Sequence, residues 1–126
     1  GAERLKGGYA YKKLLEQNNW LPLGTDFPVE EINPFKTFLA AVARQDSKGF
    51  PAGGFQMENA LTREQTIRGM TIWAAKANRM EKQVGSLEVG KKADFIILDQ
   101  DLMKVATDRI LQIKVLKTYL NGERVH

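Results

Sequence analysis

The chain has 126 residues, 43% of them hydrophobic and 27% charged. This composition is close to the globular average, so we expect a hydrophobic core and not a disordered chain. Its net charge of +4 comes from basic residues scattered among acidic ones, so we expect no nucleic-acid partner. Because it has no cysteine, and no apolar run near the roughly 20 residues that span a bilayer, we expect neither disulfides, nor thiolate chemistry, nor a membrane partner.

The first expected elements are a helix and a short strand. A helix is predicted over residues 3–18, with an apolar stripe that begins at Tyr11. Gly7 and Gly8 each cost about 1 kcal/mol in a helix interior, so its true start is expected near Gly8. Residues 20–24, Trp-Leu-Pro-Leu-Gly, form an apolar run of the length of a buried strand. The proline in this run argues against a central position in a sheet, because it donates no ladder hydrogen bond.

A second helix is predicted to begin at Asn33 and Pro34. The Asn side chain caps free amides, and proline at the first helical position has no amide to lose. Apolar residues then recur at i, i+3, i+4 and i+7 from Phe35, which predicts one buried face as far as about Arg44. Residues 45–60, rich in glycine, are expected to form a long loop.

The remaining signals predict one more helix and then strands. Thr62 and Gln65 have the spacing of a capping box, which predicts a helix to about Lys76. Further on, the β-favouring run 95–98 predicts a strand, and the Asn-Gly pair at 121–122 predicts a hairpin turn. Such a change from helices to strands is typical of a boundary between two structural units, here expected near residue 80.

Asp26 is the candidate for catalytic chemistry. It directly follows the apolar run 20–24, and a carboxylate at the C-terminal tip of a buried strand is where α/β barrels place catalytic groups. Such a group can bind a metal ion and take the proton from a metal-activated water. The alternative is that Asp26 only shapes a turn, since Asp is common in turns. The chain has one histidine, His126, so a metal site with several histidines cannot form within it. We expect His126 to be a solvated terminal residue.

Five segments, in order, resemble the amidohydrolase superfamily. Residues 85–99, Gly-Ser-Leu-Glu-Val-Gly-Lys-Lys-Ala-Asp-Phe-Ile-Ile-Leu-Asp, resemble its G-S-L-x-x-G-K-x-A-D-hydrophobic segment. Residues 23–29 resemble the G-S-D-x-P-V stretch after the eighth barrel strand. Residues 4–11 and 40–44 resemble the branch of predicted metal-dependent hydrolases with a TIM-barrel fold, and residues 115–125 resemble the closing V-x-x-T-x-x-x-G hairpin.

The resemblance implies an α+β fragment of a larger enzyme. Residues 1–80 would be the last βα elements of a TIM (β/α)8 barrel, and residues 81–126 would be strands of a small β-sandwich domain. Asp26 would be the strand-eight aspartate, which in the family contacts the metal and acts as general base. The candidates for lining the substrate pocket are Thr25, Phe27 and Pro28, although turn packing explains the last two equally well.

The resemblance also implies a divalent metal, zinc or a similar ion, and a small-molecule substrate with a non-peptide carbon–nitrogen bond in the intact enzyme. The family's histidine ligands would precede Gly1, so we expect the chain alone to be inactive and not to hold metal tightly. Exposed strand edges favour as partner the rest of the parent barrel, or another copy in a swapped or edge-paired homo-oligomer. The alternative is a freestanding α+β interaction module derived from such an enzyme, which would bind through the loop 45–60.

Overall fold

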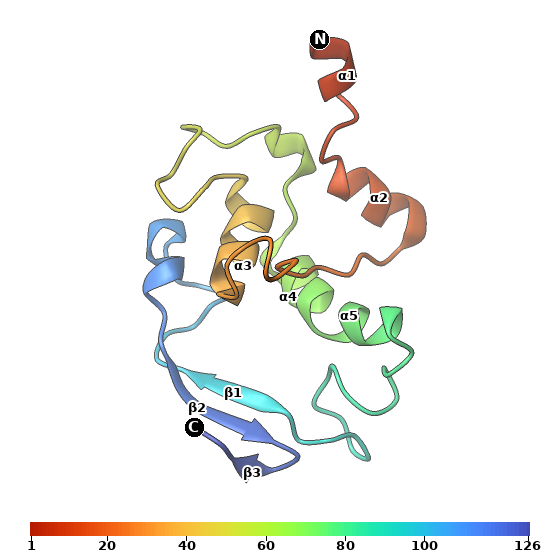
Figure 1. Cartoon of the computed structure of the whole chain (residues 1–126), viewed down its shortest axis with the longest axis vertical. Helices are drawn as coiled ribbons and strands as arrows, with labels where there is room; N and C mark the ends of the chain where they lie inside the picture. The colour runs from red at the N-terminus through yellow and green to blue at the C-terminus, as the bar shows by residue number, and fades with distance from the viewer.

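The structure, a computed structural model, describes residues 1–126, apart from the side chain of Ala2. Five α-helices precede a small sheet (Figure 1). The helices are α1 (Ala2–Leu5), α2 (Tyr11–Asn18), α3 (Pro34–Ala43), α4 (Arg63–Met70) and α5 (Ile72–Ala77), with 3-10 helices η1 (Met57–Asn59) and η2 (Thr107–Gln112). The strands are β1 (Phe95–Leu98), β2 (Val115–Leu120) and β3 (Glu123–Arg124). Among the described residues, no helix has both the length and the apolar character to cross a membrane.

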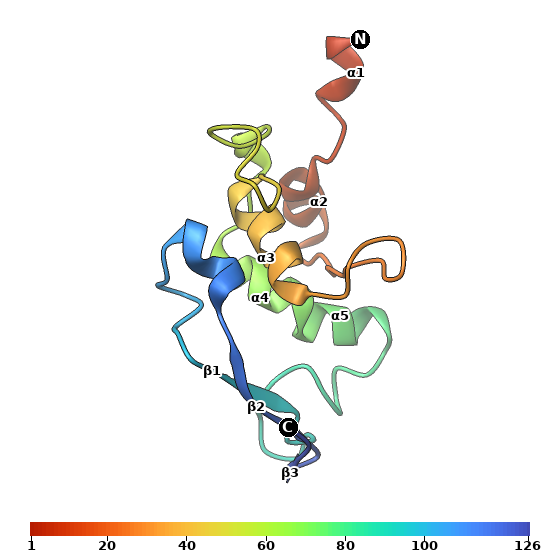
Figure 2. The same cartoon turned by 60° about the vertical axis from the view of Figure 1, so that its left-hand side comes forward.

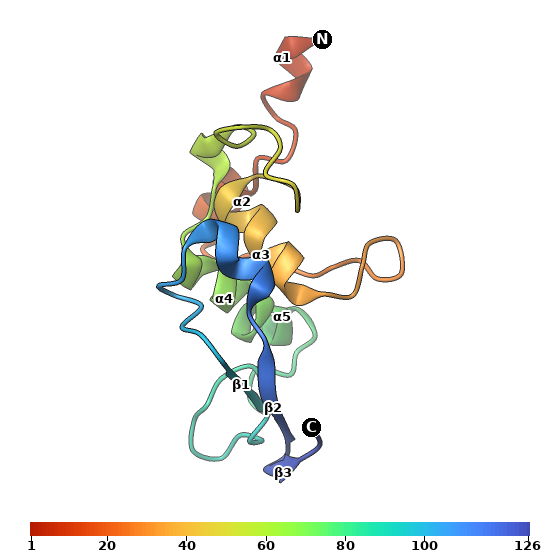
Figure 3. The same cartoon turned by 90° about the vertical axis from the view of Figure 1, so that its left-hand side faces the viewer.

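The helix predicted over residues 3–18 is interrupted. α1 and α2 are separated by a turn that contains the two adjacent glycines and Tyr9, whose φ is 57°. α1 extends away from the rest of the molecule in all three views (Figures 1, 2 and 3). The predicted C-terminal end is confirmed: Asn19 adopts the left-handed conformation, and its backbone N–H donates to the Leu15 carbonyl at 2.7 Å.

The predicted start and buried face of α3 are confirmed. The Asn33 side-chain oxygen accepts a hydrogen bond from the Phe35 N–H at 3.0 Å, and Pro34 is the first helical residue. Phe38 on the predicted face is fully buried. The helix ends at Ala43, one residue before Arg44, which adopts φ 54°.

The capping box is also confirmed, but the helix that follows it is divided. The Thr62 hydroxyl accepts from the Gln65 N–H at 3.1 Å, and the Gln65 side chain accepts from the Thr62 N–H at 2.9 Å. The single helix predicted to about residue 76 breaks between α4 and α5 at Thr71, where φ is −123° and ψ is −94°. Thr66 inside α4 is buried, with its hydroxyl donating to the Thr62 carbonyl at 2.8 Å.

The hydrophobic core joins α3 to η2, an element that the sequence patterns do not predict. Buried residues Phe35, Phe38, Leu39 and Ala43 of α3 form one cluster with Ile110 and Ile113. Figures 1 and 2 both show η2 beside α3. The core therefore includes residues on both sides of residue 80. The expected division into a barrel part, residues 1–80, and a sandwich part, residues 81–126, stays a prediction.

The sheet is a three-stranded antiparallel meander, β1-β2-β3. Phe95 pairs with Tyr119, their rings stacked 4.5 Å apart, and the register shifts between Ile97 and Leu98. The predicted hairpin turn between β2 and β3 is confirmed, with φ of 51° at Asn121 and 84° at Gly122. The observed class is α+β, as predicted, whereas membership of a barrel and of a β-sandwich stays a prediction.

The apolar run before Asp26 is not a strand here, contrary to expectation. Residues 20–25 have no regular secondary structure. The physical reason is that a strand requires a neighbouring strand, and this run lies against a helix instead: the Leu23 N–H donates to the Gly69 carbonyl of α4 at 2.9 Å. A Cβ on Gly69 would lie 2.7 Å from Leu23 Cγ, so the absence of a side chain there allows the close approach.

Candidate functional site

Asp26 begins the loop that joins residues 20–25 to α3. Its φ is 56°, its side chain is exposed, and its backbone carbonyl accepts from the Val29 N–H at 2.8 Å. The Thr25 hydroxyl accepts from the Phe27 N–H at 3.2 Å and holds the same turn. In the described structure the Asp26 carboxylate takes part in no ion pair. The turn therefore depends on the backbone of Asp26, and its carboxylate is free to meet a ligand.

The described residues do not make a metal site by themselves. No group of three His, Cys, Asp or Glu side chains in this part of the structure is placed to hold an ion. His126 is exposed beside the sheet, where its backbone carbonyl accepts from the Thr118 N–H at 3.1 Å. The donor set thus does not fit a bound divalent metal, for which Asp26 would be one carboxylate ligand among several.

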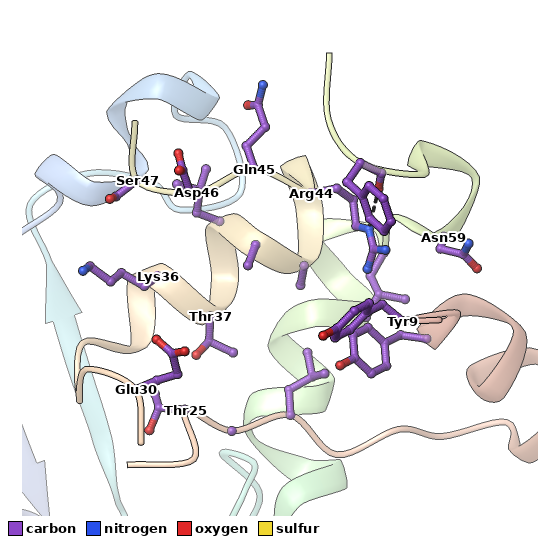
Figure 4. Close-up of a pocket in the computed structure, with 18 of the residues that line it drawn as sticks. Tyr9, Thr25, Glu30, Lys36, Thr37, Arg44, Gln45, Asp46, Ser47 and Asn59 are labelled. Atoms are coloured by element: carbon purple, nitrogen blue, oxygen red, sulfur yellow. Dashed lines mark hydrogen bonds between the residues drawn. The ribbon is translucent and has the colours of Figure 1, made fainter. Parts of the chain in front are cut away.

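A cleft of about 650 Å³ lies beside α3 (Figure 4). It is bounded by α3, by residues 22–25 before it, by residues 44–61 after it, and by Tyr9 and Tyr11. Of the residues predicted to form the site, only Thr25 lines this cleft, and Asp26, Phe27 and Pro28 do not. The exposed loop and the cleft are therefore neighbouring features that meet at Thr25 and again at Glu30 and Glu31.

Arg44 is held between two aromatic rings at the C-terminal end of α3. Its Cζ lies 5.9 Å from the centre of the Tyr11 ring and 5.7 Å from that of Phe55, and its Nε donates to the Phe55 carbonyl at 2.9 Å. Figure 4 shows the Arg44 side chain on the same side of the cleft as Tyr9. Within the described residues its buried Nη2 has no hydrogen-bond partner. The aromatic contacts fix the guanidinium and leave one donor unused.

Asn59 is a second polar residue of the cleft that lacks a partner. Its exposed fraction is 2%, and in the described structure no group donates to its buried Oδ1. Its backbone N–H donates to the Gln56 carbonyl at 2.9 Å, which places the residue at the end of η1. Most buried polar groups in proteins are hydrogen-bonded, so an unpaired donor and an unpaired acceptor in one cleft are unusual. The sequence patterns predict neither, because Arg44 reads as a helix end and Asn59 as part of a loop.

Two carboxylates have lowered pKa values, and both belong to tight turns. The backbone N–H groups of Phe50 and Lys48 donate to Asp46 and lower the pKa of its carboxyl. The Ser86 hydroxyl, and with it the Lys91 ammonium, lowers the pKa of the Glu88 carboxyl. Neither environment is that of a general base at neutral pH, because both favour the ionised, hydrogen-bonded carboxylate.

Comparison with known proteins decides the family. The family described as the amidohydrolase family matches the chain over residues 1–126. The chain belongs to the amidohydrolase family. The expected resemblance to the C-terminal part of an amidohydrolase is thereby confirmed, and the segments 23–29 and 85–99 lie inside the matched region.

Relatives of this amidohydrolase chain include enzymes and a plant protein. An N-substituted formamide deformylase of Arthrobacter pascens is 30% identical over 90% of the chain, and this covers 20% of the relative. Protein LONG AFTER FAR-RED 3 of Arabidopsis thaliana is 34% identical over the whole chain and 21% of its own length. An imidazolonepropionase of Desulfotalea psychrophila is 29% identical over 99% of the chain and 28% of its own length. The chain thus spans a fifth to a little over a quarter of these relatives. No solved structure matches it significantly.

Proposed function

We propose that the chain is part of a longer metal-dependent hydrolase that cleaves a non-peptide carbon–nitrogen bond in a small molecule, and that Asp26 is its contribution to the active site. The family match over all 126 residues supports the hydrolase assignment. The free, exposed carboxylate of Asp26, directly after the apolar run, is the observation that carries its catalytic role. The deformylase among the relatives supports the bond type.

In this proposal the Asp26 carboxylate accepts and holds a proton during hydrolysis. A general base needs a carboxylate oxygen that no other group of the chain occupies, and no ion pair of the described structure includes Asp26. The Thr25 hydroxyl bonded to the Phe27 N–H keeps the turn in one conformation and so orients the aspartate. Phe27 is 60% exposed at the tip of the same loop, where it and Pro28 would contact a substrate.

The proposal assigns the rest of the active site to residues outside this chain. A divalent ion such as zinc would supply Lewis-acid chemistry in the intact enzyme. Because the described residues cannot hold such an ion alone, we expect the isolated chain to be inactive. This is tested by adding zinc to the purified chain and assaying amide, lactam and ester substrates. Turnover above background would contradict the assignment.

The role of Asp26 is tested in the full-length gene product. We expect Asp26→Asn to lower kcat by about 10²–10⁴-fold, the usual contribution of a general acid or base. Asp108→Asn, which removes the same charge from an exposed position in η2, should leave kcat unchanged. A full-length Asp26→Asn enzyme with unchanged kcat would mean that this aspartate serves the turn only.

An interaction module is the second candidate function, favoured by the exposed aromatic side chain of Phe50 in the loop 45–60, which is 71% exposed. The length of the reading frame in the source gene distinguishes the two functions. A reading frame that continues for several hundred residues upstream supports the hydrolase, whereas one that starts near Gly1 supports the module.

A further inference from the structure

We infer that the cleft beside α3 holds the part of the substrate beyond the scissile bond, and that Glu30 selects substrates that carry a cationic nitrogen there. The inference rests on the proposed function, because it takes the reacting end of the substrate to lie at Asp26. It adds a specificity-determining residue and a substrate class, small molecules that combine an apolar group with an amine.

A reverse turn connects Asp26 to the cleft on both of its sides. The Val29 N–H donates to the Asp26 carbonyl at 2.8 Å, and the end residues of such a turn have Cα atoms within about 7 Å of each other. Thr25 and Glu30 directly flank the turn and both line the cleft, whereas residues 26–29 do not. One further residue adds about 3.8 Å, so the Cα of Glu30 lies within about 11 Å of that of Asp26. A small molecule that reacts at Asp26 is therefore long enough to reach Glu30.

The cleft has the size and the walls of a small-molecule site. Its volume of about 650 Å³ is within the roughly 300–1,000 Å³ that is typical of ligand pockets. Pro22, Leu23 and Ala40 line it with apolar side chains that are exposed or half-buried, so they can cover an apolar group of a ligand. The walls therefore favour a substrate that is partly apolar.

Glu30 is the charged group of the lining that the chain itself leaves unpaired. The lining has three carboxylates and two cations: Glu30, Glu31, Asp46, Lys36 and Arg44. Lys36 is paired with Glu31 at 2.5 Å, and Asp46 accepts two backbone N–H groups of its own loop. The exposed carboxylate of Glu30 takes part in no ion pair of the described structure. The lining thus has one carboxylate more than it has cations, and it attracts a cation more than an anion.

The second cation of the lining lies away from Glu30. Figure 4 shows Glu30 at one end of the cleft and Arg44 at the other. The guanidinium of Arg44 is held there between two aromatic rings, with its Nε bonded to a backbone carbonyl. A cationic nitrogen at Glu30 therefore avoids the repulsion that it would meet at the far end of the cleft.

Calorimetric titration of the full-length gene product with benzylamine and benzyl alcohol tests the site without any reaction. The two probes share an apolar ring, and the amine is protonated at neutral pH. Benzylamine should bind about two- to fivefold more tightly, the usual effect of one exposed ion pair, and added salt should reduce the difference. Equal affinities would overturn the inference. Failure of both probes to bind would mean that another part of the protein fills the cleft, and it would overturn the inference too.

Glu30→Gln assigns the difference to one residue. The variant keeps the size of the side chain and removes its charge, so it should weaken the binding of benzylamine to that of benzyl alcohol and leave benzyl alcohol unchanged. For amide substrates that end in an ammonium group, it should raise KM and leave kcat unchanged. Glu123→Gln, at an exposed position in β3, is the matched control and should change neither. An equal loss of benzylamine affinity in both variants would show a general effect of surface charge and contradict the assignment.

Asp26→Asn separates this inference from the proposed function. It removes the proposed base and keeps Glu30, so turnover should be lost while the preference for benzylamine remains. An active Asp26→Asn enzyme that still prefers benzylamine would remove the catalytic role of Asp26 alone. Loss of turnover in Asp26→Asn, together with equal binding of the two probes by the unaltered enzyme, would remove the role of Glu30 alone.

Discussion

Replacing Gly85 with alanine tests how closely the turn after α5 packs on that helix. An ideal Cβ at Gly85 would lie 2.7 Å from the Ala75 Cβ and 3.0 Å from the Ile72 Cα, both in α5. Gly85 also has φ of 92°, a conformation that residues with a side chain rarely adopt. Gly90 is the matched control: its φ is 89°, but nothing lies within 4 Å of its ideal Cβ.

The two variants should differ by the energy of the contact alone. Positive φ costs alanine about 1–2 kcal/mol at either position. Overpacking adds about 1–3 kcal/mol at Gly85, because the obstructing atoms include a helix backbone that cannot move freely. We therefore expect losses in the free energy of unfolding of about 2–5 kcal/mol for Gly85→Ala and about 1–2 kcal/mol for Gly90→Ala. Urea unfolding followed by circular dichroism measures both. Equal losses would refute the close approach of this turn to α5.

Two further predictions concern local structure. Asn33→Ala should lower the free energy of unfolding by about 1 kcal/mol, because α3 loses its side-chain cap. Asn33→Asp keeps a capping oxygen, so it should lower the free energy of unfolding much less in the same urea experiment. Asp46→Asn should destabilise the chain at neutral pH and less so in acid. Because the folded pKa of Asp46 lies below its ordinary value of 3.8, its stabilisation is complete above that pH and is lost as the pH falls through the folded pKa. Urea midpoints of both proteins between about pH 2 and about pH 7 would measure this, and a difference that does not change with pH would contradict it.

The helix caps and the hairpin could be predicted from the sequence because they are local. Asn33 and Thr62 bond to amides two or three residues away, and the Asn-Gly turn depends on its own backbone angles. No distant part of the chain needs to be known for any of these. The family motifs are local in the same sense, and they predict both the family and Asp26 as the candidate carboxylate.

The tertiary structure decided the features that depend on distant neighbours. η2 packs on α3 through Ile110, although no local pattern predicts it, because its stability comes from burial against a helix some 70 residues earlier. Residues 20–25 have the composition of a strand but form none, because pairing needs a neighbouring strand and the nearest backbone partner is Gly69 of a helix.

For the site, the sequence by itself determined the family and indicated Asp26 as the candidate carboxylate. Only the tertiary structure decided that Arg44 and Asn59 line one cleft, each with an unpaired buried atom. The physical reason is that solvation and hydrogen-bond satisfaction are properties of a three-dimensional neighbourhood. A polar residue in a loop has the same letter whether it meets water, a protein partner or nothing at all.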